Sequence, residues 1–237
     1  LPEEQTGDGK TLYRAGFKLG AYDHSLPLVI DPVLDFGTYL GGAKDEFANS
    51  IAVDKNFNAW IVGRTQSVDF PKHPAAGESL KGSTDAFVSV IDPSGRHLLL
   101  SRYIGGSGDE GAMSLAVSKN QVVYFGGWTT SSDFPGTAGS YQDAYGGNQP
   151  DGLGDGFITR IIGPQVESTY IGGSREDYVR ALVLSADETH IYAVGGTSSG
   201  DDPDNPDDKK FPVKNSPYDK AGYDQDVFVL KIDNTLT

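Results

Sequence analysis

The sequence contains no cysteine. Disulfide bonds, thiolate nucleophiles and cysteine-ligated zinc sites are therefore excluded. Basic residues are also scarce, since 19 Lys and Arg stand against 33 Asp and Glu and give a formal net charge of −14. A surface this negative repels phosphate backbones and anionic lipids, so we expect no nucleic acid partner.

Long apolar runs and helical periodicity are missing as well. No segment approaches the roughly 18 consecutive apolar residues that suggest a membrane-spanning helix, so no membrane insertion is expected. Apolar residues do not recur with a helical period of about 3.6 residues. The 31 Gly and 13 Pro are instead typical of many short strands joined by turns.

One four-residue motif occurs three times. It reads Tyr-Leu-Gly-Gly at 39–42 and Tyr-Ile-Gly-Gly at 103–106 and 170–173. Each copy is followed by an acidic pair, an apolar strand and later a Phe-Pro, and each ends in an Asp-x-Phe that opens another apolar strand. Self-similarity with this period indicates stacked copies of one supersecondary unit.

Each unit is expected to form four antiparallel strands rich in β-branched and aromatic residues. The first strands are predicted at 48–54, 112–118 and 179–185, the second at 59–63, 122–127 and 191–196, the third at 86–92, 156–162 and 227–233, and the fourth at 98–104 and 166–171. Pro93-Ser94-Gly95 is predicted to form a tight turn. Such a unit is the blade of a β-propeller, so the predicted fold is all-β, a propeller-like array of three four-stranded blades.

The repeats occupy residues 34–237, with starts near 39, 103 and 170, and follow an N-terminal segment at 1–33. Residues 34–40 have the sequence of a fourth strand, so they are expected to complete the blade begun by the C-terminus. Propellers usually have about four to eight blades, and three are too few for a ring. An open arc, a ring completed by another copy and a piece of a longer chain remain as alternatives. The last is favoured, also because the sequence starts at Leu1 without Met.

The repeats carry further shared motifs. They are Ala52-Val53-Asp54, Asp69-Phe70-Pro71 and Asp85-Ala86-Phe87-Val88 in the first copy, Asp133-Phe134-Pro135 and Asp155-Gly156-Phe157-Ile158 in the second, and Phe211-Pro212 and Asp226-Val227-Phe228-Val229 in the third. This pattern resembles the bacterial SBBP β-propeller repeat family. Residues 22–32 are similar to the end of the domain that often precedes such repeats. The resemblance implies an extracellular or cell-surface location and no established catalytic residues.

The acidic pairs fall at one position in every repeat. In a propeller they would gather on one face, where they would either bind Ca²⁺ or a cationic ligand, or simply solvate a turn. Two unit charges about 4 Å apart in water repel by only about 1 kcal/mol, so the second alternative requires no cation. The calcium candidates are Asp45, Glu46, Asp109, Glu110, Glu176 and Asp177.

Three other positions recur, and each has two interpretations. The Asp before the third strand is predicted to cap a loop, and the alternative is a ligand role. The Phe before Pro is predicted to anchor a loop between blades, and the alternative is stacking against a sugar. The Tyr of the repeat motif is predicted to be a core residue whose hydroxyl finds a partner. The residues are Asp85, Asp155 and Asp226; Phe70, Phe134 and Phe211; and Tyr39, Tyr103 and Tyr170.

Several other sequence patterns give weaker evidence about function. The acidic stretch 201–208 fails the EF-hand pattern, and we expect an exposed insertion there, with weak Ca²⁺ binding as the alternative. Gly106–Gly111 satisfies a dinucleotide-binding pattern and Gly196–Gly200 a nucleophile-elbow pattern, but no helix is predicted after either. The four histidines occupy unrelated repeat positions and form no metal pair.

The sequence therefore favours a non-catalytic protein without a cofactor, a structural, adhesive or assembly scaffold at or outside the cell surface. Its partners would be other proteins or further copies of itself, bound through open blade edges. The alternatives are a carbohydrate-binding propeller module, assisted by Ca²⁺, and an enzyme acting on polysaccharide.

Overall fold

A computed structural model describes residues 4–5, 11–12, 21, 25, 34–75, 78–147, 154–200, 209–214 and 225–237. The chain divides into two units, Leu1–Asp35 and Phe36–Thr237. In the first unit, β1 (Glu4–Gln5) pairs antiparallel with β2 (Thr11–Leu12). The second unit contains the repeats.

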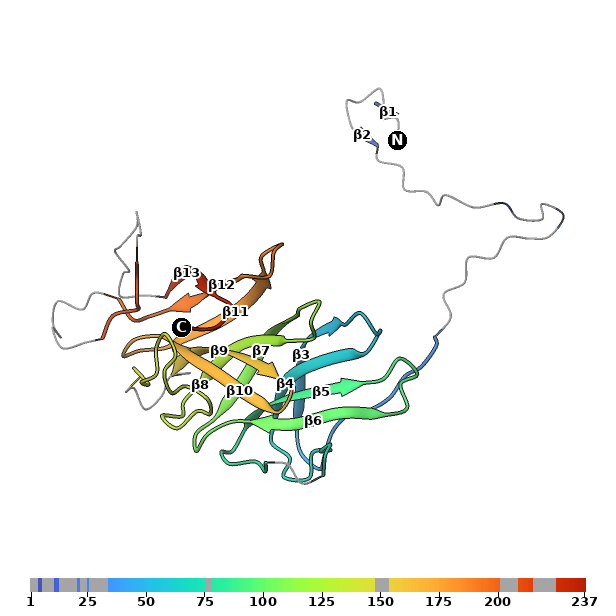
Figure 1. Ribbon diagram of the computed structural model, residues 1–237, viewed down its shortest axis with the longest axis horizontal. Helices are drawn as coiled ribbons and strands as arrows, with labels where there is room; N and C mark the ends of the chain where they lie inside the picture. Colours follow the sequence, from blue (N-terminus) through green and yellow to red (C-terminus); the bar gives the residue numbers. More distant parts are fainter. Residues whose placement is uncertain are drawn as a thin grey trace. The chain divides into compact units, whose positions relative to one another are not determined.

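The repeats form three antiparallel sheets in which strand order follows the chain (Figure 1). The first sheet contains β3 (Glu46–Val53), β4 (Ala59–Thr65), β5 (Asp85–Ile91) and β6 (Leu98–Ile104). The second contains β7 (Glu110–Val117), β8 (Val123–Thr129), β9 (Asp155–Ile162) and β10 (Gln165–Ile171). The third contains β11 (Asp177–Leu184), β12 (His190–Thr197) and β13 (Asp226–Asp233).

These sheets confirm the all-β prediction, and the described part of the chain contains no helix. The prediction of four strands in every sheet is wrong for the third sheet, which has three. The segment at 34–40, which was expected to complete this sheet, belongs to no strand.

The second sheet lies between the other two. Strand β7 contacts β3, β4 and β5, whereas β11 contacts β7, β8 and β9. We call the face of a sheet toward the preceding repeat its leading face and the opposite face its trailing face. Every residue of β8, in the sheet with neighbours on both faces, is buried, whereas β13 of the third sheet alternates between covered and exposed residues.

One packing scheme is used twice. Val62 and Val88 on the trailing face of the first sheet pack with Leu115, Phe125 and Phe157 on the leading face of the second. In the same way, residues on the trailing face of the second sheet pack with the leading face of the third, namely Tyr124, Ile158 and Ile171 with Leu182, Ile191 and Phe228. The repeated sequence motifs therefore encode a repeated interface between sheets.

Tight turns close the hairpins where the sequence predicts them. Gly95 has a φ of 71°, which favours glycine, and its N–H donates to the Asp92 carbonyl at 3.0 Å. Asp92 Oδ1 accepts from the Arg96 and His97 N–H groups at 2.9 and 3.0 Å. The Pro93-Ser94-Gly95 turn is thus confirmed, and a strand-end Asp stabilises it.

Candidate functional site: carboxylate junctions between sheets

The structure separates the two members of each acidic pair. The second member is the opening residue of a first strand: Glu46 opens β3, Glu110 opens β7 and Asp177 opens β11. Glu110 and Asp177 are fully buried, whereas Asp45 is exposed. The second and third pairs therefore do not present both of their carboxylates to solvent, as the predicted surface ring of acidic pairs requires, whereas Glu46 of the first pair is half-buried.

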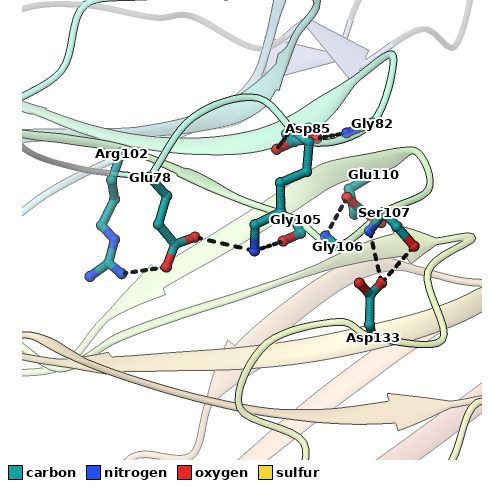
Figure 2. Close-up of polar contacts among 10 residues, drawn as sticks. Glu78, Gly82, Asp85, Arg102, Gly105, Gly106, Ser107, Glu110 and Asp133 are labelled. Carbon is teal, nitrogen blue, oxygen red and sulfur yellow. Dashed lines mark hydrogen bonds and ion pairs between the residues drawn. The ribbon is translucent and has the colours of Figure 1, made fainter.

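We call the second member of each acidic pair the inner carboxylate and the first member the outer carboxylate. The inner carboxylate connects the Gly-Gly turn to the end of the second strand through hydrogen bonds. Glu110 Oε1 accepts from Thr129 Oγ1 at 2.7 Å and from Ser131 Oγ. Its Oε2 accepts from the Gly106 N–H at 3.0 Å (Figure 2). Asp177 Oδ2 accepts from the Gly173 N–H at 2.8 Å and from Ser199 Oγ at 2.7 Å. Burial of such a group is tolerated only with hydrogen-bond partners of this kind.

The outer carboxylate of the second pair, Asp109, holds a loop of the preceding sheet. Its Oδ1 accepts from the N–H groups of Ser83 and Thr84, both at 2.9 Å. Another acid on the same side of the turn, Asp133, accepts from the N–H of Ser107 at 2.8 Å and from its hydroxyl at 2.9 Å (Figure 2). These acidic side chains act as caps for backbone donors.

At the second and third Gly-Gly turns, a second buried carboxylate comes from the preceding sheet. Asp85 accepts from the N–H groups of Lys81 and Gly82, both at 3.1 Å, and Asp155 accepts from that of Gly146 at 2.8 Å. The prediction that these two residues cap loops is confirmed. They also lie beside the inner carboxylate of the next sheet, which the sequence analysis did not predict.

The glycines of the repeat motif mark the place where the two carboxylates meet. A Cβ added to Gly105 would lie 2.6 Å from Asp85 Cγ and would overlap the Glu110 carboxylate. A Cβ on Gly172 would lie 2.8 Å from Asp177 Oδ2 and 3.0 Å from Asp155 Oδ1. We call these sites the first junction (Asp85, Glu110, Gly105) and the second junction (Asp155, Asp177, Gly172).

Burial shifts the pKa values of the junction carboxyls upward. Loss of hydration raises the pKa of Glu110 to about 7, against the opposing hydrogen bonds from Ser131 and Thr129. It raises the pKa of Asp155 to about 7 and that of Asp177 to about 6, and the pKa of Asp85 also rises. The charge of the neighbouring carboxylate adds to the shift, since like charges disfavour ionisation.

The two junctions differ in the group that approaches the glycine carbonyl. Lys81 Nζ donates to the Gly105 carbonyl at 3.2 Å and lies 3.9 Å from Glu78, which in turn lies 3.9 Å from Arg102 (Figure 2). At the second junction Gln142 Nε2 donates to the Gly172 carbonyl at 3.2 Å and to Asp155 Oδ2 at 3.3 Å. An ammonium group and an amide therefore serve the same place in successive repeats.

The contacts described for Glu110 and Asp177 are hydrogen bonds from N–H and O–H groups. Within the described ranges, no group of three or more His, Asp or Glu is placed to hold a metal ion. Calcium takes about six to eight oxygen ligands, whereas Glu110 faces N–H and O–H donors. Glu110, Asp155 and Asp177 are each 0% exposed, so a substrate in solvent does not reach them. Calcium binding by the acidic pairs remains a prediction.

The recurrent aromatic residues are buried at equivalent positions. Phe70, Phe134 and Phe211 each pack on the Phe of the following strand, with ring centroids 4.6 Å apart in all three pairs. Tyr170 Oη donates to the Ser131 carbonyl at 2.8 Å and accepts from the Phe134 N–H at 3.1 Å, and Tyr103 makes the equivalent two bonds. The prediction of a loop anchor between sheets is confirmed for Phe134 and Phe211, whereas Phe70 packs only within the first repeat. The core prediction is confirmed for Tyr103 and Tyr170 and is wrong for Tyr39, which is fully exposed.

Some predicted features lie outside the described residues. They are the acidic stretch 201–208, most of the segment 22–32 and His24. The pairing of carboxylates across sheets was missed, although both members recur at fixed repeat positions. The signal was present in the sequence, but the distance between them depends on how the sheets pack.

Comparison with known proteins gives no further guide to the role of these junctions. The chain matches no protein-family model, and a search of curated proteins found no match. Among the described residues, no helix is long and apolar enough to cross a membrane.

Proposed function

We propose that this protein is a non-catalytic scaffold of the propeller-repeat type, at the cell surface or outside the cell, with a structural or adhesive role. One observation carries the proposal: the recurrent polar residues of the repeats are used to fasten sheets and loops to one another. The resemblance of the motifs to SBBP repeats supports the same conclusion. We infer no catalytic function.

The mechanism is rigid display of the loops between strands. Contacts between successive repeats limit their relative motion, since Asn49 Nδ2 donates to the Ala112 carbonyl at 2.7 Å and the Lys119 N–H donates to Glu188 at 3.1 Å. Apolar burial between the sheets adds to these contacts. In repeat proteins, such nearest-neighbour interfaces supply much of the stability.

Native-state hydrogen exchange tests the rigidity of the scaffold. The amides of β4, β8 and β12 should share one opening free energy, because each sheet depends on its neighbour. Substitution Leu182→Ala, on the leading face of the third sheet, should reduce protection in the second sheet as well. Independent opening of each sheet, with no effect of Leu182→Ala outside the third, would contradict a rigid scaffold.

A glycan array, with and without a chelator, tests the alternative of carbohydrate binding. The three repeated Phe side chains are 1–7% exposed and Trp128 is 8% exposed, so these rings are not available as stacking platforms. We therefore expect no glycan to bind. Reproducible binding that the chelator abolishes would favour the calcium-assisted alternative over the scaffold.

A further inference from the structure

Apolar residues are exposed on two sheet faces at opposite ends of the array, although Phe70 covers Phe87 and Tyr103 on the leading face of the first sheet. On the leading face of the first sheet, Ile51 and Val53 are 66% and 62% exposed. On the trailing face of the third sheet, Val227 and Val229 are 81% and 78% exposed, and Val183, Tyr192 and Val194 are exposed beside them. Exposed apolar patches of this kind mark interaction sites.

Both faces have buried counterparts inside the chain. Ile51 occupies the repeat position of Leu115, which is 8% exposed, and of Leu182. Val229 occupies the position of Val88 and Ile158, which are both 0% exposed. The two bare faces are therefore the two halves of the interface that joins the first sheet to the second and the second to the third.

The segment at 36–40 is held where a preceding sheet would have its fourth strand. After it, the N–H groups of Ala43 and Lys44 donate to Asp69 Oδ1 and Ser67 Oγ at 2.9 and 2.7 Å. After β6, the N–H groups of Ser107 and Gly108 donate to Asp133 Oδ1 and Ser131 Oγ at 2.8 and 2.7 Å. This equivalence places the segment at 36–40 in the position of β6, although no strand accompanies it.

The third sheet lacks the strand that this segment would supply. Tyr103 pairs with Phe87 in the first sheet, and Tyr170 pairs with Phe157 in the second. The same register would place Tyr39 opposite Phe228 on β13. Tyr39 is fully exposed, whereas both equivalent tyrosines are 0% exposed.

We propose that two copies of this chain associate head to tail. The segment 36–40 of one copy pairs with β13 of the other, and the leading face of the first sheet packs on the trailing face of the third. The inference rests on the proposed scaffold role and names its partner. Glu46 and Asp226 would then take the positions of Glu110 and Asp85, which completes a third carboxylate junction.

A second copy is favoured over closure within one chain. The first and third sheets contact opposite faces of the second sheet, so the two bare faces point away from each other (Figure 1). The segment 36–40 is fixed to the first sheet at Ala43 and Lys44, and five extended residues span only about 17 Å. A head-to-tail contact repeats in every copy, so it produces a closed ring or a filament.

Light scattering after size-exclusion chromatography tests the association. We expect a mass of at least twice 25.2 kDa at micromolar concentrations. Tyr39→Ala and Val229→Lys should each weaken association at least about tenfold, because anchors at the centre of an interface dominate its energy. Tyr141→Ala is the control, since Tyr141 is 43% exposed but lies on neither bare face. A monomeric wild-type chain, or assembly that Tyr39→Ala and Val229→Lys leave unchanged, would overturn the proposal.

Cysteine cross-linking tests the register and the identity of the occupant. The chain contains no cysteine, so Thr38→Cys with Val229→Cys introduces a single pair. In the proposed register the two residues are directly opposite, within the Cα separation that a disulfide allows. Dimers or longer covalent products support the proposal, whereas absence of a link or a link within one monomer overturns it. A monomer that still opens as one unit in hydrogen exchange would leave the scaffold role intact.

Discussion

Folding raises the pKa values of three buried carboxyl groups, those of Glu110, Asp155 and Asp177. Their pKa values of about 7, 7 and 6 lie above the ordinary values of 4.5 and 3.8 because burial disfavours their charged forms. The folded protein therefore binds more protons than the unfolded chain between about pH 4 and pH 7. Stability from these groups is fully present below pH 4 and is lost as the pH rises through 6 to 7.

Substitution Asp155→Asn should remove part of this pH dependence. The amide cannot ionise, and Asp155 Oδ1 has no hydrogen-bond partner that the substitution would remove. One pKa unit corresponds to about 1.4 kcal/mol. The free energy of unfolding of the variant, relative to that of the wild type, should therefore be higher at pH 8 than at pH 5 by on the order of a few kcal/mol. Thermal unfolding across this range measures the difference.

Asp45→Asn provides a charge-matched control for this comparison, because Asp45 is exposed. The control should shift the unfolding temperature equally at both pH values. If Asp155→Asn shows the same pH profile as the wild type, the junction carboxyl is ionised in the folded protein and the assignment fails.

The three tyrosines of the repeat motif offer an internal series. Tyr103→Phe and Tyr170→Phe each remove a buried hydroxyl that serves a backbone donor and a backbone acceptor. Each substitution should cost about 1–3 kcal/mol in chemical denaturation, because two buried hydrogen bonds are lost. At Tyr103 the Phe70 N–H keeps only a long bond of 3.4 Å to the Ser67 carbonyl. Tyr39→Phe should cost almost nothing in dilute solution. Equal losses of unfolding free energy at all three positions would contradict this expectation and would show that the Tyr39 hydroxyl makes a hydrogen bond in the unassociated chain.

At the scale of the element, each first strand carries a β-bulge at the same place. The irregularity falls between Ala48 and Ser50 in β3, and its equivalents fall between Ala112 and Ser114 and between Val179 and Ala181. A glycine of the second strand faces each bulge, namely Gly63, Gly127 or Gly195. A bulge bends its strand and increases the local twist.

Substitution Gly127→Ala should destabilise the protein by about 2 kcal/mol or more. An added Cβ would overlap the Gly111 carbonyl oxygen, so β7 and β8 would have to separate. Gly163→Asn is the control, because Gly163 has a φ of 59° and open space around it, and Asn tolerates that conformation. Urea denaturation measures the stability of both variants. If Gly127→Ala leaves the free energy of unfolding unchanged, β7 and β8 do not approach as closely at Gly127 as described.

The strands could be predicted from the sequence because each uses local signals. Alternating apolar residues, the Pro93-Ser94-Gly95 turn and the recurring Asp-x-Phe predicted the positions of the repeat strands to within two residues. The junctions could not be predicted in the same way. Asp85 and Glu110 are 25 residues apart, and only sheet packing brings them to one glycine. Burial also reversed the surface prediction for Glu110, which looked like a solvated turn residue.

For the whole molecule, stability should depend on which sheet faces have a neighbour. Leu115 and Ile51 occupy equivalent repeat positions, but Leu115 is 8% exposed between two sheets and Ile51 is 66% exposed. Leu115→Ala should therefore cost about 2–5 kcal/mol, because it removes apolar contacts and leaves a cavity. In dilute solution Ile51→Ala should change stability by no more than about 0.5 kcal/mol, as for other exposed substitutions.

The stability cost of Ile51→Ala, compared with that of Leu115→Ala, should depend on protein concentration if the chain associates. If copies pack head to tail, Ile51 becomes buried, and the cost of Ile51→Ala should rise toward that of Leu115→Ala as the concentration increases. Denaturation of both variants over a hundredfold range of concentration measures the change. A cost for Ile51→Ala that stays small at every concentration would mean that the leading face of the first sheet has no partner in solution, while the Leu115→Ala result would still report on packing between the first two sheets.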